Sequence, residues 1–155
     1  MDPTSLEYAN LIAWIAAVKH GVHLGKTQLQ KLLFIFYGVC FAKFGNPPFL
    51  DDTPKAFPFG PVFPRPYKRY MGYPVELTKA DKDCFMQHQE ILKVAVEIVD
   101  EFSGYSATRL SEWSHKDGSP WKEAVYRDGQ PAWGREISAD KIKEFFSKPD
   151  WKIGI

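Results

Sequence analysis

The chain has 155 residues, and its formal net charge is +1 because 20 Lys and Arg oppose 19 Asp and Glu. Hydrophobic residues make up 45% and charged residues 25%, which is ordinary for a globular protein. The 12 Phe, 7 Tyr and 5 Trp exclude intrinsic disorder. The near-neutral balance argues against a protein that coats nucleic acid with its whole surface.

Several further classes are excluded by segments of the chain. The apolar run 32–42 lies between Lys31 and Lys43 and is far shorter than the ~20 residues of a membrane span. The first residues carry acids and no Lys or Arg, unlike a secretory signal. We therefore expect no membrane partner and a cytoplasmic location. In that compartment Cys40 and Cys84 are best interpreted as reduced core residues.

Apolar spacing and capping residues predict about six helices. Thr27 is the expected N-cap of the second, and an apolar stripe from Phe85 to Phe102 predicts that the third is continuous. The predicted ranges are 4–20, 27–44, 78–104, 106–115, 119–126 and 138–148.

The segment 46–74 differs, because it combines eight prolines with seven Phe and Tyr. We expect a loop that packs onto the helices, with a short or edge strand near residues 55–59 and a short helix near 65–71. The predicted fold is one mainly α-helical domain, residues 1–155, with this loop inserted after the second helix; a short β-hairpin within the loop is an alternative.

Metal and phosphate sites are weakly indicated. His20 and His23 are three residues apart, but a zinc site needs a second pair of ligands, so a helix-end role is the alternative. The adjacent acids Asp51 and Asp52 are typical of a solvated loop, and no glycine-rich phosphate motif occurs. We expect no metal and no cofactor.

A hydrolytic site is another hypothesis for the function. Ser111, Ser114, His115 and Asp117 crowd one segment, but the sequence has no GxSxG elbow. The alternative is that His115 makes a buried hydrogen bond near Trp121. We expect no catalytic residues.

The segment 54–79 has five basic residues and one acid, a balance of +4, with Phe and Tyr between them. Such a surface suits nucleic acid or an acidic protein, and the remaining alternative is a core of aromatics with a solvated basic rim. Segment 81–112 has seven acids against three bases, a balance of −4, so the two segments are also candidates to face each other.

The order of several short motifs resembles the Panacea domain, the family of SocA-like antitoxins and phage-associated GepA-type proteins. The resemblance spans residues 8–146. Two departures are Phe57-Pro58, where the family usually has Trp, and Ser114, where Thr is usual. The residues that carry the resemblance, which we interpret as scaffold, are Leu29, Gln30, Lys31, Leu32, Gly60, Pro61, Val62, Leu110, Ser111, His115, Pro120 and Trp121.

The resemblance implies a mostly helical antitoxin that neutralises a protein toxin by direct contact. Some SocA-like members instead deliver the toxin to the ClpXP protease, and neither role requires an active site or a cofactor. We place the toxin contact in the loop 57–73, at partly exposed side chains. The proposed contact residues are Arg65, Tyr67, Lys68, Arg69 and Tyr70.

Overall fold

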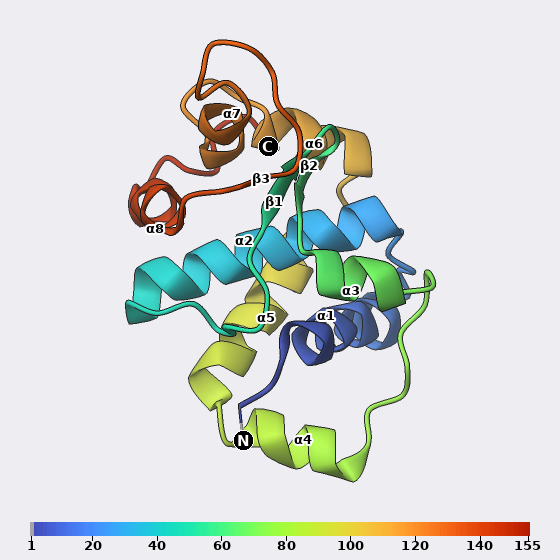
Figure 1. Cartoon of the computed structure of the whole chain (residues 1–155). Coiled ribbons are helices and arrows are strands. Elements are labelled where there is room, and N and C mark those ends of the chain that lie inside the picture. Colours follow the sequence, from blue (N-terminus) through green and yellow to red (C-terminus); the bar gives the residue numbers. More distant parts are fainter. Residues whose placement is uncertain (1) are drawn as a thin grey trace.

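Eight helices and three short strands make up the fold in a computed structural model that describes residues 2–155 (Figure 1). The predicted mainly α-helical class with a hairpin after the second helix is confirmed. The elements are α1 (Ser5–His20), α2 (Lys26–Phe44), β1 (Lys55–Phe57), β2 (Gly60–Val62), α3 (Pro64–Arg69), α4 (Lys79–Met86), α5 (Gln89–Phe102), α6 (Ala107–Ser114), α7 (Pro120–Val125), β3 (Arg135–Glu136) and α8 (Ala139–Ser147).

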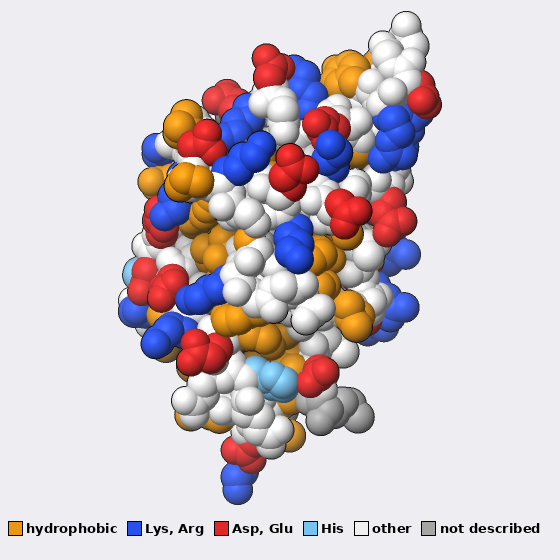
Figure 2. All heavy atoms as spheres, turned by 90° about the vertical axis from the view of Figure 1, so that its left-hand side faces the viewer, with side chains coloured by type: hydrophobic (Ala, Val, Ile, Leu, Met, Phe, Trp, Pro, Cys, Tyr) orange, Lys and Arg blue, Asp and Glu red, His pale blue; other side chains and the backbone are white. Residues whose placement is uncertain are grey.

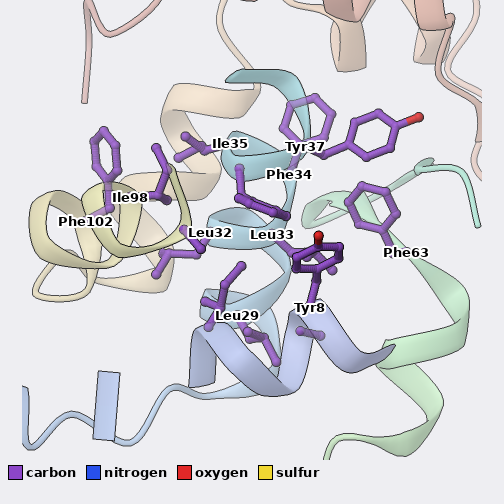
Figure 3. Packing of buried hydrophobic residues seen from close by; sticks show 14 of the residues in the cluster. Tyr8, Leu29, Leu32, Leu33, Phe34, Ile35, Tyr37, Phe63, Ile98 and Phe102 are labelled. Carbon is purple, nitrogen blue, oxygen red and sulfur yellow. The ribbon is translucent and has the colours of Figure 1, made fainter. Parts of the chain in front are cut away.

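Helix α2 forms the centre of the molecule. It packs against α1 and α5 on one side and against β2, α6 and α8 on the other (Figure 1). Its residues 29–38 are all buried, which is expected of a helix that is apolar all around and covered on every face. Figure 3 shows this packing, with Ile98 and Phe102 of α5 on one side of α2 and Phe63 on the other.

Helix ends follow local capping chemistry, with one correction. Thr4 and Glu7 form a reciprocal capping box at the start of α1, the helix expected over residues 4–20. The N-cap of α2 is Gly25, not Thr27. The side chain of Gln28 accepts the Gly25 N–H, and the helix therefore begins earlier in the chain than expected.

The predicted third helix is two helices, so the prediction of a continuous helix is wrong. The chain bends at Gln87 and His88. Before the bend, α4 lies across the lower end of the molecule, and after the bend α5 runs behind α1 and α2 (Figure 1). The bend lets Phe85 pack against Tyr8, with 5.5 Å between the ring centroids. Tertiary packing of Phe85 therefore outweighs the continuity of the helical pattern.

The small sheet has the order β2-β1-β3, with both pairs antiparallel. The strand expected near 55–59 is short, but the alternative of an edge position is wrong, because Arg135 and Glu136 pair with β1 from the other side. The aromatics of segment 46–74 divide into two groups. Phe49, Phe63 and Tyr70 are buried, whereas the exposed ones are Phe57, Phe59, Tyr67 and Tyr73.

Charges of the acidic segment 81–112 pair with other parts of the chain. Asp100 binds Lys19 and His20 of α1, and Glu101 binds Lys152 near the C-terminus. Among residues 2–155, no ion pair joins this segment to the basic segment 54–79. Figure 2 shows the face on the side of α8, where cationic and anionic side chains are interspersed around a central group of hydrophobic ones.

Candidate partner-binding site

The β-hairpin is held on α2 by a buried side-chain amide. Gln30 accepts the Phe63 N–H at 2.7 Å and donates to the Phe63 carbonyl oxygen at 3.3 Å. Both backbone groups of Phe63 are thereby satisfied in a buried position, where an unpaired group is costly. Gln30 thus determines where the chain leaves the hairpin and enters α3.

Helices α6 and α7 hold the tip of the hairpin. The hydroxyl of Ser111 donates to the Phe59 carbonyl oxygen at 2.9 Å, and the Trp121 indole N–H donates to the Phe57 carbonyl oxygen at 2.8 Å. Pro120 is the first residue of α7 and places Trp121 in the first turn. The motif residues that are distant in sequence therefore meet around one turn.

Lys31 lies beneath this turn with a fully buried side chain. Gly60 passes directly over it with φ of 119°, and a Cβ there would lie 2.4 Å from the Lys31 Cε atom. Only glycine allows both this backbone angle and this approach. Within residues 2–155 the Lys31 ammonium has no hydrogen-bond partner, and burial lowers the pKa of Lys31 to about 8.

His115 stacks on Trp121 with ring centroids 3.7 Å apart and an angle of 10° between the ring planes. The predicted position near Trp121 is correct, but the predicted buried hydrogen bond is absent at Nε2, which is buried without a partner in the described part of the chain. Burial lowers the pKa of His115, and the charges of Lys31 and Lys122 lower it further. The stacking, rather than a hydrogen bond, holds the ring.

The hydroxyl groups near His115 are committed to backbone carbonyls. Ser114 donates to the Ser111 carbonyl oxygen and Ser119 to that of Ser114, each at 2.8 Å. Asp117 is exposed, and its hydrogen bond with Lys122 lowers the pKa of the Asp117 carboxyl. The arrangement lacks the serine–imidazole–carboxylate chain that the hydrolase hypothesis requires.

A cavity of about 370 Å³ opens between the hairpin, α2 and α3. Lys31 and Gln30 line it from α2, and the ammonium of Lys26 lies 4.8 Å from the centroid of the Tyr67 ring at its side. The other lining residues, mostly apolar, are Thr27, Phe57, Pro58, Phe59, Val62, Pro64, Tyr67 and Lys68.

The five predicted contact residues do not form one surface. Tyr67 and Lys68 line the cavity just described, whereas Arg69 and Tyr70 line a second cavity, of about 380 Å³, between α1, α3 and α4. Arg65 is exposed, but Tyr70 is buried because its hydroxyl donates to the Leu24 carbonyl oxygen. The expectation of exposure is wrong for Tyr70.

Sequence reasoning overlooked two features of the first cavity. Phe57 and Phe59 are exposed, at 37% and 70%, although loop aromatics were expected to pack inward. Lys31 was assigned to the scaffold without any indication that its charge is buried. The signal for its burial was the position of Lys31 in the middle of a helix segment, residues 29–38, that is otherwise almost entirely apolar. All of these residues are buried, and a lysine there cannot reach solvent.

Asp51, Asp52 and His20 have structural partners. Asp51 accepts two hydrogen bonds from Ser5 at 2.8 Å, and Asp52 accepts the Arg65 N–H at 2.7 Å, so both acids cap helix starts rather than being merely solvated. His20, in the last turn of α1, contacts Asp100. Residues 2–155 contain no cluster of His, Cys, Asp and Glu suited to a metal ion, and none of their helices could cross a bilayer.

Comparison with known families places these motif residues in context. The model described as antitoxin SocA-like, Panacea domain, matches residues 29–122, well over half of the chain. The chain belongs to this family. The matched range runs from the first motif residue, Leu29, to just past the last, Trp121, so it contains the whole anchored hairpin. No curated protein and no solved structure matches the chain significantly.

Proposed function

We propose that this Panacea-domain protein is an antitoxin that neutralises a cognate protein toxin by direct contact. Family membership supports the antitoxin role. The observation that supports a contact at the first cavity is the group of exposed aromatics Phe57, Phe59 and Tyr67 beside Lys68. Large aromatics next to a cation are typical of the residues that dominate binding energy at protein interfaces.

The hairpin is suited to this role because its backbone is anchored by hydrogen bonds while Phe57 and Phe59 at its tip are exposed. Ser111 and Trp121 fix the turn through the carbonyls of Phe59 and Phe57. A preorganised surface loses little conformational entropy on binding. The aromatic tip can vary in sequence without disturbing these anchors, because both anchors bind backbone atoms.

The test begins with capture of partners from the native host, with and without nuclease. A captured protein is then expressed alone and together with this chain in a bacterial host. We expect growth arrest by the captured protein alone and rescue by co-expression. The variant Phe59→Ser with Lys68→Glu should abolish rescue, whereas Arg69→Glu at the second cavity should retain it.

Four results distinguish the alternatives. Constant toxin levels during rescue support blocking, and a fall that requires ClpXP supports proteolytic delivery in the cytoplasm. Nuclease-sensitive recovery of nucleic acid without a toxic protein supports the nucleic-acid hypothesis, whose affinity would fall steeply with salt. Rescue that survives Phe59→Ser with Lys68→Glu but is lost with Arg69→Glu would move the contact to the second cavity.

A further inference from the structure

The buried ammonium of Lys31 lacks a counterion. Its side chain is fully buried, and its Nζ atom has no hydrogen-bond partner among residues 2–155. Buried charges in proteins are normally paired or hydrogen-bonded, because removing an ion from water is costly. The Ser114 hydroxyl is the nearest polar side chain to Gly60 besides Lys31, and it already donates to a backbone carbonyl.

A second buried polar atom without a partner lies close enough to Lys31 to sense its charge, although His115 is not among the residues that line the cavity. Nε2 of His115 is buried and unpartnered in the described chain, and the charge of Lys31 lowers the pKa of His115. Lys31 comes from α2 and His115 follows α6, so two distant segments contribute nitrogen atoms and neither contributes an acid. The hairpin turn at Gly60 covers Lys31.

The adjoining cavity has the volume and lining of a small ligand site. Its volume of about 370 Å³ lies within the range of about 300–1,000 Å³ that is usual for such sites. Phe57, Phe59 and Tyr67 supply apolar walls, and Lys31 lines the inner side. Lys68 also lines the cavity but is exposed, so Lys31 is the buried cation of the lining. A dianion such as phosphate would be poorly solvated against these walls, whereas a monoanion on an apolar body fits both the walls and this buried cation.

We propose that this cavity binds a carboxylate carried on an apolar body, with the Lys31 ammonium as its counterion. The carboxylate belongs to a free small molecule or to the terminus of a bound polypeptide. Because Nζ is enclosed beneath Gly60, binding requires the end of the Lys31 side chain to rotate toward the cavity that Lys31 lines. The inference stands on the cavity and on the unpartnered ammonium in its wall, and holds whether or not the protein is an antitoxin.

The test is a titration of the full-length protein followed by ¹H–¹⁵N NMR. The first probe is octanoate, and octanamide is its neutral control. The second is a short peptide that ends in Leu-Phe with a free carboxylate, and the same peptide with a C-terminal amide is its control. The third probe is inorganic phosphate. We expect a carboxylate probe to shift the Gly60 amide signal with saturation, and to bind at least about tenfold more tightly than its amide. Octanoate binding identifies a small-molecule site, and binding of the peptide acid alone identifies a polypeptide terminus.

One variant connects the binding to the buried ammonium. Lys31→Met should weaken carboxylate binding at least about tenfold, because the counterion is lost. Lys93→Met, an exposed lysine of α5, is the matched control and should bind as the unmodified protein does.

Each opposite outcome would overturn the proposal. Equal affinity for acids and amides, or phosphate binding that exceeds carboxylate binding, rules out carboxylate recognition. Unchanged binding in Lys31→Met, with its fold verified by circular dichroism, excludes Lys31 as the counterion. Because these measurements use the protein alone, failure of the carboxylate site would leave the toxin-rescue assay unaffected.

Discussion

The buried ammonium of Lys31 imposes an electrostatic cost on this fold. Burial lowers its pKa from 10.5 to about 8, a change that corresponds to about 3 kcal/mol of stability. The cost is present while the folded and unfolded chains both carry the charge, which is the case below pH 8. The apolar packing of α2 must offset it, and a lysine retained at such a position is typical of a functional group.

Stability should therefore increase with pH in the range where only the unfolded chain holds the Lys31 proton. Between about pH 8 and pH 10.5 the unfolded state binds more protons than the folded state, so alkalinity favours folding. We expect the free energy of unfolding of the unmodified protein to rise by up to about 3 kcal/mol over this range relative to Lys31→Met. Urea unfolding of both proteins at several pH values measures the difference.

The comparison with Lys31→Met removes effects that both proteins share. Burial also raises the pKa of Tyr37 to about 12, which lowers the stability of both proteins above pH 10. A difference in unfolding free energy that stays constant from pH 8 to pH 10.5 would show that the Lys31 ammonium is not buried in solution.

At the scale of elements, the approach of α8 to α2 depends on one glycine. A Cβ at Gly38 would lie 2.0 Å from the Cδ2 atom of Phe146, far inside van der Waals contact. Phe146 in turn packs against Phe34 and Trp151, with centroids 5.6 and 5.1 Å away. A glycine inside a helix normally reduces helix stability, so here close packing compensates for the poor helix propensity.

Gly38→Ala tests which of the two effects is larger. The substitution gains up to about 1 kcal/mol of helix propensity, while forcing the Phe146 ring aside should cost about 1–3 kcal/mol. We therefore expect net destabilisation, measured as a lower midpoint in thermal and urea unfolding.

Two companion variants make this result specific. A Cβ at Gly104 meets no atom within 4 Å, so Gly104→Ala should leave stability nearly unchanged. Combining Gly38→Ala with Phe146→Ala should cost less than the sum of the two single changes, because the clash is removed. Strict additivity would mean that α8 is not packed on Gly38.

For the whole molecule, the core extends beyond the range that matches the family model. Residues 29–122 match, but α1 and α8 lie outside that range and both pack on α2. Their buried residues, Tyr8 and Ile12 in α1 and Ile142 and Phe146 in α8, belong to the same hydrophobic cluster as α2. One continuous core supports the proposal that residues 1–155 form a single domain.

A single domain should unfold as one cooperative unit. We expect the full chain to show one transition with coincident near- and far-ultraviolet circular dichroism. A fragment of residues 29–122 should lose this cooperativity, because it exposes the faces of α2 that α1 and α8 cover. Two separate transitions in the full chain, or a fragment that unfolds as sharply as the parent, would indicate a smaller independent unit.

Local signals in the sequence were sufficient for most helix boundaries. Thr4, Ser106, Ser119 and Ser138 cap the helices that they were expected to cap, because a capping hydrogen bond joins residues only three apart. The order of the motifs between Leu29 and Trp121 likewise indicated the family before any packing was known.

Tertiary structure decided the features on which the proposed function rests. The bend between α4 and α5, the central position of β1 and the outward aromatics Phe57 and Phe59 all depend on contacts between distant segments. The burial of Lys31 is the clearest example, because its charge is enclosed only when Gly60 and the helices after it fold over α2. Local hydrogen bonding specifies where a helix begins, but solvent exposure depends on chain segments far apart in sequence.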